Sequence, residues 1–289
     1  MPEKDCINKY LTPFGIEKEY TNFEKSRFHV ICVPYSETVS YIKGTENGPS
    51  AILKASTQVE LYDRKSKTEP YLKGISCSTI DTSNDIKEIW HQISKEVTSC
   101  IEKDKFAVIL GGEHTISQGA IDACYNKTPD LTVIQIDAHA DLREEYEGNP
   151  FSHACALRYA FDKGINIVQI GIRSLCKEED LLIQENPQQI TTFFADTRPI
   201  DIRAVIKNIK TPNLYITIDL DGFDPSVIPH VGTPEPGGPD WYDITSLLEE
   251  LFLNFNVIAA DIVELCPSDS SVVSDFAAAK LLYKLLSLK

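Results

Sequence analysis

Asp137, His139 and Asp141 occupy alternate positions in the segment VIQIDAHADLR, residues 133–143, and all three are residue types that bind metal ions. They directly follow residues 133–136, an apolar run whose β-branched side chains predict a buried strand. Side chains two residues apart in an extended chain point the same way, so the three can converge at the end of the strand. A polar turn would explain one aspartate there, but three ligands at this spacing favour a metal site.

Further candidate ligands follow other apolar segments that are expected to be strands. His114 follows residues 106–110, Asp219 and Asp221 follow residues 214–218, and Glu264 follows residues 257–263. A parallel sheet gathers the carboxyl ends of its strands along one edge, where ligands bind. We therefore expect all of these side chains to meet the ligands of residues 137–141. His29 and His91 have no such company and are expected to be packed or surface residues.

Four aspartates and two histidines form too charged a set for a single metal ion. Four carboxylates gathered without cations would repel one another and be largely protonated, whereas two divalent cations balance their charge. Oxygen ligands with some imidazole and no thiolate favour Mn²⁺ over Zn²⁺. Two such ions about 3.5–4 Å apart can share a hydroxide and bring the pKa of its parent water towards neutrality. The residues therefore predict a binuclear manganese hydrolase whose site suits a cationic electrophile.

Strands and helices alternate along the whole chain. The expected strands are short, continuous apolar runs, which are typical of strands covered on both faces: residues 28–33, 74–80, 106–110, 133–136, 166–171, 190–194, 214–218 and 257–263. The expected helices include residues 85–103, 153–162 and 271–286. This alternation predicts a single α/β domain over residues 1–289, with three α/β/α layers and a central parallel sheet. A barrel of alternating strands and helices is the competing architecture.

The composition limits the compartment and the partners of the protein. With 28 basic and 43 acidic residues among 289, the formal net charge is −15, which argues against nucleic acid or an anionic membrane as a partner. No segment has the pattern of a signal peptide or the length of a transmembrane helix. The eight cysteines are scattered without a CxxC pair, so we expect reduced thiols in a cytoplasmic protein.

Several blocks resemble those of the ureohydrolases, the arginase and agmatinase family, over nearly the full length of the chain. The blocks are GGEHTIS (111–117), IDAHADLR (136–143), SHACALR (152–158), ITIDLDGFDPS (216–226), GTPEPGG (232–238) and VELCP (263–267). Together they are highly specific, although any one alone would be modest. The resemblance implies a three-layer arginase-like fold, two Mn²⁺ ions per chain and a homo-oligomer, either a trimer or a hexamer.

The resemblance also implies roles for individual residues. One metal ion would bind His114, Asp137, Asp141 and Asp219, and the other would bind Asp137, His139, Asp219 and Asp221. The implied catalytic residues are His153, Glu264 and Asp141, and the implied substrate-binding residues are Glu264 and His153. His153 matches the family's proton-transfer histidine, and Glu264 matches the acid that holds the substrate guanidinium, whose planar fork of N–H donors a carboxylate accepts in a bidentate manner. The simpler interpretations are a capping or surface role for His153 and a salt bridge to a structural arginine for Glu264.

Substrate choice depends on the loop that precedes His153. Arginases resemble one another in an asparagine and a serine that serve the amino-acid end of arginine, and this chain has Arg143 and Asn149 at those places. The loop therefore looks like that of the agmatinase branch, which implies hydrolysis of agmatine, a small cationic guanidino compound, to putrescine and urea in polyamine biosynthesis. Three glutamates in residues 144–147 could suit a distal ammonium, or they form a solvated charge run.

Departures from the agmatinase pattern leave other functions open. His230 stands where many agmatinases have glycine, and Cys266 stands where many have asparagine. Another ureohydrolase is one alternative: an arginase, a guanidinobutyrase or a formiminoglutamase. Substrates of the last two end in a carboxylate and need a cation near the mouth, for which Arg143 and Arg158 are candidates. A catalytically silent homologue that binds a regulator is the other alternative, and the intact set of ligands disfavours it.

Overall fold

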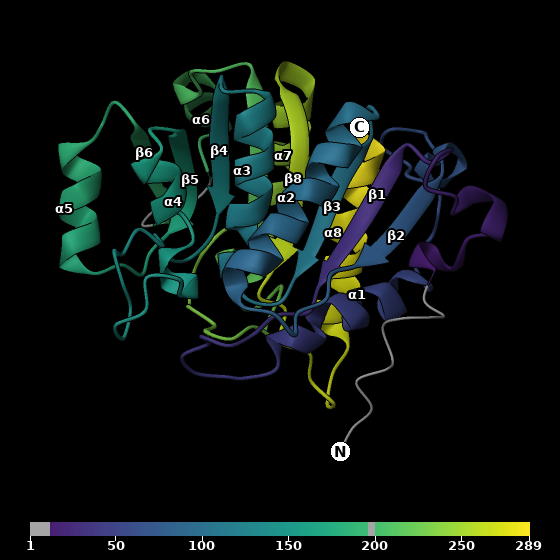
Figure 1. Ribbon diagram of the computed structural model, residues 1–289, viewed down its shortest axis with the longest axis horizontal. Helices are drawn as coiled ribbons and strands as arrows, with labels where there is room; N and C mark the ends of the chain where they lie inside the picture. Colours follow the sequence, from purple (N-terminus) through teal and green to yellow (C-terminus); the bar gives the residue numbers. More distant parts are fainter. Residues whose placement is uncertain (1–11, 196–199) are drawn as a thin grey trace.

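The computed structural model describes residues 12–195 and 200–289. Its centre is one sheet of eight parallel strands between two layers of helices (Figure 1). The strands lie in the order β2-β1-β3-β8-β7-β4-β5-β6. Their bounds are β1 Phe28–Val33, β2 Ile75–Thr79, β3 Phe106–Gly111, β4 Leu131–Ile136, β5 Asn166–Ile172, β6 Ile190–Phe194, β7 Asn213–Asp219 and β8 Asn256–Val263. Because the sheet is open, with β2 and β6 at its edges, the three-layer prediction is confirmed and the barrel is wrong.

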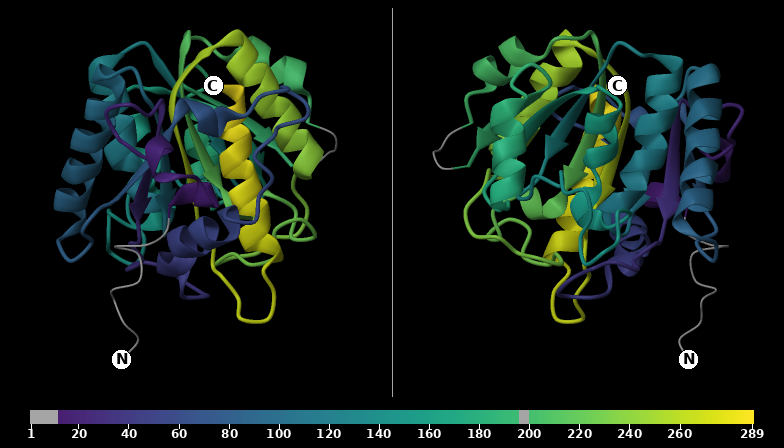
Figure 2. Two further views of the ribbon diagram at one scale, coloured as in Figure 1. Left: turned by 90° about the vertical axis from the view of Figure 1, so that its right-hand side faces the viewer. Right: turned by 60° about the vertical axis from the view of Figure 1, so that its left-hand side comes forward.

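The helices divide evenly between the two faces of the sheet. One face is covered by α2 Ile86–Glu102, α3 Ser117–Lys127, α4 Arg158–Asp162 and α5 Lys177–Glu185. The other face is covered by α1 Gly48–Ser56, α6 Ile202–Asn208, α7 Trp241–Asn254 and α8 Val273–Leu288. In the left view of Figure 2, the sheet lies between α2 and α8. Both faces of the sheet are therefore buried.

The two buried faces explain why the strands read as continuous apolar runs. In β4, Ile134 and Ile136 pack into the core beneath α1, α6, α7 and α8, whereas Leu131 and Val133 pack into the core beneath α2 to α5. All four side chains are at most 1% exposed. A strand with no solvent-facing side lacks the regular apolar–polar alternation of a half-exposed strand, and the two polar residues inside β4, Thr132 and Gln135, are themselves buried and hydrogen-bonded.

The structure differs from the prediction in the segment that begins at His153. The sequence predicts one helix over residues 153–162, but a 3₁₀ turn at His153–Cys155 is separated from α4. The carbonyl oxygen of Ala154 accepts from the backbone N–H of Arg143 at 3.3 Å, and the N–H of Leu157 donates to the carbonyl oxygen of Asp141 at 3.0 Å. These backbone groups bind the ligand loop instead of a neighbouring helical turn. The predicted continuous helix is therefore wrong, and the break ties His153 to Asp141.

The cysteines and the helices bear on two further expectations. Seven cysteines lie within the described residues and all are free, as expected of reduced thiols, while Cys6 lies outside the described residues. In the described parts of the chain, no helix combines the length and the apolar content needed to cross a membrane.

Candidate active site

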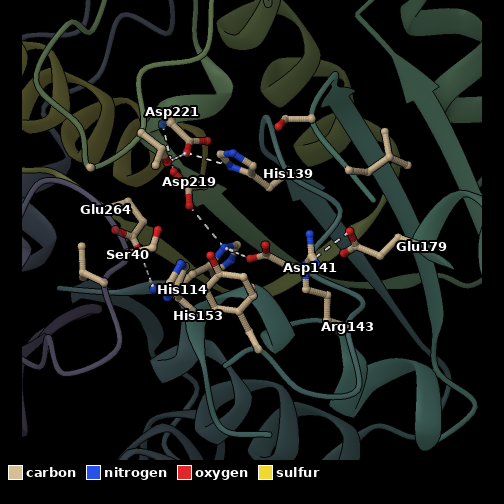
Figure 3. Close-up of a pocket in the computed structure, with 17 residues that line it drawn as sticks. Ser40, His114, His139, Asp141, Arg143, His153, Glu179, Asp219, Asp221 and Glu264 are labelled. Carbon is tan, nitrogen blue, oxygen red and sulfur yellow. Dashed lines mark hydrogen bonds and ion pairs between the residues drawn. The ribbon is translucent and has the colours of Figure 1, made fainter. Parts of the chain in front are cut away.

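The predicted ligands converge at the carboxyl edge of the sheet. Strands β3, β8, β7 and β4 are neighbours in the middle of the sheet, and a predicted ligand follows or ends each one. A cavity of about 220 Å³ opens at this edge (Figure 3). The predicted site residues that line it are His114, His139, Asp141, His153, Asp219, Asp221 and Glu264. Asp137 is fully buried behind this lining and contacts His114.

The first ligand group is centred on Nδ1 of His114. This atom lies 3.1 Å from Oδ2 of Asp137, 3.0 Å from Oδ2 of Asp141 and 3.3 Å from Oδ2 of Asp219. All four side chains are buried. None of the three approaches has the geometry of a hydrogen bond, so Nδ1 is a buried polar atom without such a partner among the described residues. A nitrogen that faces three carboxylate oxygens in this way fits a metal ion.

Hydrogen bonds behind His114 determine which ring nitrogen carries the proton. Nε2 of His114 lies 2.7 Å from the hydroxyl of Thr217, which donates its own proton to Oδ1 of Asp261 at 2.7 Å. The Thr217 oxygen can therefore only accept, and Nε2 is the donor. This assignment leaves the lone pair of Nδ1 directed at the carboxylates, as a metal ligand requires. Tyr215 also donates to Asp261 and completes the buried network.

A second ligand group lies beside the first and shares Asp137 with it. Nδ1 of His139 lies 3.0 Å from Oδ2 of Asp221 and 3.7 Å from Oδ1 of Asp137. Asp137 thus presents one carboxylate oxygen to each imidazole. Asp219 lies close to both groups, since its Oδ1 accepts the backbone N–H of Asp221 at 2.9 Å. The arrangement has the donors for two ions with a shared carboxylate between them.

Burial and crowding shift the pKa values of the ligand side chains. Burial, together with the charge of Asp137, raises the pKa of Asp141 to about 7. Burial also raises the pKa of Asp219 well above its ordinary value, and Asp221 and Asp137 add to the effect. Burial lowers the pKa of His139, but Asp221 and Asp137 outweigh it and raise the pKa to about 12. The group therefore carries an excess of negative charge that two divalent cations would neutralise.

A row of hydrogen bonds across the sheet holds the shared carboxylate. Gln135 donates to Oδ2 of Asp137 at 2.8 Å, Gln169 donates to Oε1 of Gln135 at 2.7 Å, and Thr192 donates to Oε1 of Gln169 at 2.7 Å. These three residues belong to β4, β5 and β6. Because Gln135 and Gln169 are fully buried, their amides are held rigidly. The row fixes the orientation in which Asp137 meets the two histidines.

Glu264 enters the cavity from the end of β8. Its Oε1 accepts the backbone N–H of His114 at 2.7 Å, and the residue is 7% exposed. No arginine or lysine among the described residues pairs with it, so the structural salt bridge is not found. Glu264 and Asp141 have φ angles of 65° and 54°. Such left-handed conformations cost about 1–2 kcal/mol for non-glycine residues and concentrate at functional sites.

His153 forms another wall of the cavity. Its Nδ1 lies 3.1 Å from the Thr38 hydroxyl oxygen, and its backbone N–H donates to the same oxygen at 3.0 Å. The ring of Tyr146 packs edge-on against it, with 5.9 Å between ring centroids. Burial, with His139 and His114 adding to it, lowers the pKa of His153 to about 4, so the ring is neutral near pH 7. His153 thus presents a neutral imidazole on the cavity wall instead of lying on the outer surface.

The loop residues expected near the far end of the substrate divide into two groups. Arg143 lines the cavity, with its Nε 3.7 Å from Oε2 of Glu179 and its guanidinium 5.3 Å from the ring centroid of Tyr146. Arg158 instead pairs with Glu144 and Asp162 and does not line the cavity. The glutamates at 144, 145 and 147 are exposed and also lie outside the lining, as does Asn149. The acidic run is therefore a solvated surface.

The two departures from the agmatinase pattern lie behind the cavity. Nδ1 of His230 is 3.1 Å from the hydroxyl of Ser274, and the Cys266 thiol donates to the carbonyl oxygen of Lys43 at 3.5 Å. Neither His230 nor Cys266 is a lining residue. Both side chains therefore support the loops around Glu264 without reaching a substrate in the cavity.

Several residues at the site had no predicted role. Ser40, Tyr146, Ser174, Glu179 and Thr233 line the cavity, and Thr38 and Glu113 lie behind His153. Asp261 could have been found from the sequence, because a carboxylate inside the apolar strand of residues 256–263 is costly without partners. The remaining residues lie in loops, or at a helix, whose position relative to the cavity the sequence does not specify.

The chain is similar to known proteins over most of its length. Residues 26–287 match the arginase family. The N(1)-aminopropylagmatine ureohydrolase of Synechocystis sp. is 40% identical over 277 residues, which cover 92% of this chain and 90% of that protein. The agmatinase of Halalkalibacterium halodurans is 32% identical, with 92% and 93% covered. The crystal structure of agmatine ureohydrolase from Thermoplasma volcanium has a TM-score of 0.84 and 30% identity, with 93% and 91% covered.

Proposed function

Because this chain belongs to the arginase family, we propose that it is a binuclear manganese ureohydrolase that cleaves agmatine to putrescine and urea. One observation carries the proposal: two histidine–aspartate groups that share Asp137 open onto the same cavity as the carboxylate of Glu264. The ligand groups suit a pair of cations, and Glu264 suits a guanidinium. Hydrolysis of the guanidinium carbon–nitrogen bond is the chemistry that combines the two.

The side chains present fit two metal ions. We assign His114, Asp137, Asp141 and Asp219 to one ion, and Asp137, His139, Asp219 and Asp221 to the other. The partnerless Nδ1 of His114 supports the first assignment, and the contact of His139 with Asp221 supports the second. A donor set of carboxylates and imidazoles without thiolates suits Mn²⁺. When bound, such a pair would lower the pKa of a water molecule towards neutrality, so that the water can lose a proton and attack an electrophilic carbon near pH 7.

The protein side chains bind the substrate and move the proton. Glu264 accepts N–H donors of the guanidinium and holds its planar carbon beside the ligand groups. Asp141 is a carboxylate that can accept a hydrogen bond from the attacking water and keep it oriented. His153, neutral at pH 7, accepts a proton lost by that water and donates it to the departing alkyl amine. Water and the guanidino compound are thereby converted to urea and a free amine.

The far end of the cavity favours an amine over an amino acid. Among the described lining residues, Arg143 is the one arginine or lysine, and it already lies against Glu179 and Tyr146. Glu179 in turn accepts the backbone N–H groups of Leu142 and Cys176, each at 2.9 Å. The α-carboxylate of arginine could be paired only if Arg143 left these contacts. A buried polar group left without a partner costs about 1–3 kcal/mol, and a charged group costs more, so arginine should be used at least about 5- to 150-fold less efficiently than agmatine.

A second candidate substrate is N(1)-aminopropylagmatine. The observation that favours it is the 40% identity of this chain to the N(1)-aminopropylagmatine ureohydrolase of Synechocystis sp.. This compound carries the same guanidinium as agmatine, and hydrolysis of the same bond would release spermidine in place of putrescine. The two candidates differ only beyond the distal nitrogen, at the mouth of the cavity.

A product-release screen tests the proposal. The Mn²⁺-loaded protein is assayed with agmatine, N(1)-aminopropylagmatine, arginine and guanidinobutyrate for urea, and with formiminoglutamate for formamide. We expect the highest kcat/KM for agmatine or its aminopropyl derivative. A preference for arginine or for a substrate ending in a carboxylate would refute the amine specificity. No turnover of any compound by protein with two bound metals would leave the silent homologue as the explanation.

A further inference from the structure

A buried carboxylate reaches His153 through one threonine. Glu113 is fully buried, and its Oε1 accepts the hydroxyl proton of Thr38 at 2.9 Å. Its Oε2 accepts the backbone N–H groups of Glu37 and Thr38, both at 2.7 Å. The Thr38 oxygen in turn lies 3.1 Å from Nδ1 of His153. Glu113 belongs to neither ligand group and is not a lining residue, so metal binding does not explain its burial.

The donors and acceptors in the hydrogen-bond chain from Glu113 through Thr38 to His153 determine the position of the proton on His153. Three donors converge on Glu113, which is the environment of an acceptor-only carboxylate. Thr38 has a single hydroxyl proton, and that proton is directed at Glu113. The Thr38 oxygen also accepts the backbone N–H of His153 at 3.0 Å. Toward Nδ1 of His153 it therefore offers only a lone pair, and Nδ1 must be the donor.

One other hydroxyl lies near the ring of His153. The Ser152 hydroxyl oxygen is 3.4 Å from Nδ1, compared with 3.1 Å for Thr38. Ser152 also caps the following turn, because it accepts the backbone N–H of Ala154 at 3.4 Å. Its contact with the ring is the longer of the two, and it is not connected to a buried charge. Thr38 is therefore the partner that determines the tautomer, and Ser152 provides a matched control.

We propose that Thr38 and Glu113 are positioning residues that hold His153 as the Nδ1–H tautomer, with Nε2 unprotonated and available to the cavity. Nε2 has no hydrogen-bond partner among the described residues. The inference rests on the proposed function for its kinetic consequence. During hydrolysis, Nε2 gains the proton that the attacking water loses and releases it to the amine nitrogen as the carbon–nitrogen bond breaks. Nδ1 keeps its proton throughout, so the ring returns to its starting state after each turnover.

Replacing Glu113 by glutamine should reverse the direction of the hydrogen bonds from Glu113 through Thr38 to His153. The amide oxygen would accept from the two backbone N–H groups, and the amide nitrogen would then donate to the Thr38 hydroxyl. Thr38 would be free to donate its proton to Nδ1 of His153, which would move the ring proton to Nε2 and block the base. Thr38→Val removes the hydroxyl instead, so that no Thr38 lone pair favours the Nδ1–H tautomer of His153 over the Nε2–H tautomer. The two variants therefore act differently on one measurable quantity.

The first experiment reads the tautomer directly. Ring-nitrogen chemical shifts are recorded for protein labelled with ¹⁵N-histidine and loaded with Mg²⁺, because Mn²⁺ is paramagnetic. Among six histidines, the His153 signals are those lost in His153→Ala. We expect Nδ1–H in the native protein and in Ser152→Ala, a mixture in Thr38→Val, and Nε2–H in Glu113→Gln. A native ring protonated at Nε2, or a tautomer unchanged in Thr38→Val, overturns the inference.

The second experiment tests the consequence for turnover. We expect Thr38→Val to lower kcat for agmatine about tenfold with little change in KM, because general acid–base catalysis contributes about 10²–10⁴-fold in total. Thr38→Ser should restore most of the rate. In a His153→Ala background, Thr38→Val should have no further effect, whereas an undiminished second loss would overturn the inference.

A matched control and the native protein keep the two proposals separable. Thr132→Val removes another buried hydroxyl, which lies 2.7 Å from that of Thr211 near the amino end of β4, and it should leave kcat unchanged. If the native protein released no urea from any substrate, the proposed function would fall. The ring-nitrogen spectrum would still decide the tautomer, since it does not depend on turnover.

Discussion

Replacing Glu264 by glutamine tests whether this side chain holds the substrate cation. The change removes one charge and keeps the size of the side chain. The amide oxygen can still accept the backbone N–H of His114, now bonded at 2.7 Å, so the turn at the end of β3 should be preserved. The backbone at Glu264 is left-handed, with φ 65°, and glutamine has the same steric cost there as glutamate, so the change should not strain it further. Any large effect should therefore arise from the interaction with substrate.

The magnitude follows from the burial of the site. Glu264 is 7% exposed, and no cation among the described residues pairs with it, so the substrate guanidinium would be its main charged partner. Removing one partner of a buried ion pair costs about 3–5 kcal/mol. At about 1.36 kcal/mol for each factor of ten, this corresponds to a loss of about 10²- to 10⁴-fold in kcat/KM. Because the guanidinium is charged before and during attack, much of the loss should appear as a higher KM.

The assay is steady-state urea release at fixed Mn²⁺, accompanied by elemental analysis and a thermal unfolding curve. Glu144→Gln, which removes an exposed glutamate outside the cavity lining, is the control and should change kcat/KM less than about twofold. Glu264→Gln should keep both metals and its melting temperature. If kcat/KM for agmatine stayed within threefold of the native value, Glu264 would not bind the guanidinium. If the variant lost its metals, Glu264 would act on the ligand groups instead.

Three further outcomes are expected. Asp137→Asn should abolish turnover and lower the metal content below two ions per chain with little loss of fold, because Asp137 contacts both ligand groups; normal turnover with two metals by elemental analysis would contradict the binuclear assignment. Burial raises the pKa of Glu96, but hydrogen bonds from His29 and Ser78 outweigh it and hold the pKa below its ordinary 4.5. A carboxyl group whose pKa is lower in the folded protein than in the unfolded chain stabilises the fold at pH values above the unfolded pKa, and this stabilisation is lost as the pH falls through the folded pKa. Glu96→Gln should therefore lower the free energy of unfolding by about 1–3 kcal/mol at pH 7. Denaturant unfolding curves should show this difference shrinking below pH 4.5. A Cβ at Gly112 would lie 2.1 Å from the carbonyl oxygen of Tyr35, so Gly112→Ala should lower the free energy of unfolding by at least about 1–3 kcal/mol and impair metal binding. Gly148 is the control, because its φ is 76° and a Cβ there would meet no atom within 4 Å. Gly148→Ala should lower the free energy of unfolding only by the cost of a left-handed alanine, about 1–2 kcal/mol, and leave metal binding unchanged.

The sequence predicted the sheet well because both of its faces are buried. Strands such as β4 and β7 have no solvent side, so they stand out as mainly apolar runs with ligands at one end. The parallel arrangement then implied that ligands distant in sequence would meet at one edge. The apolar segments did not predict the order β3-β8-β7-β4 in the middle of the sheet. That order depends on which helix packs on which face, and the strands are too alike to specify it.

The less predictable features lie in segments that respond to distant partners. The helix expected from His153 is broken because backbone groups of Ala154 and Leu157 bind the loop at Asp141 and Arg143. Thr38 lies in a loop 115 residues before His153, and its hydroxyl alone gives no sign of that contact. The glutamates at 144, 145 and 147 left two interpretations open, a partner for a distal ammonium or a solvated charge run, and their side chains are exposed. Local pattern cannot reveal such roles, since each depends on a loop's path across the assembled sheet.

The position of β8 has a consequence for how the protein matures. This strand is the last in the sequence, yet it pairs with β3 on one side and β7 on the other. Until it is in place, β2-β1-β3 and β7-β4-β5-β6 share no strand pairing, and His114 belongs to one block while Asp137 and Asp219 belong to the other. A chain that lacks β8 would therefore have to bring His114 to Asp137 and Asp219 without the strand that joins the two blocks. If the ligand groups bind metal ions as proposed, the ions would bind only the sheet in which β8 is in place, and they would stabilise that arrangement over one in which the two blocks are apart.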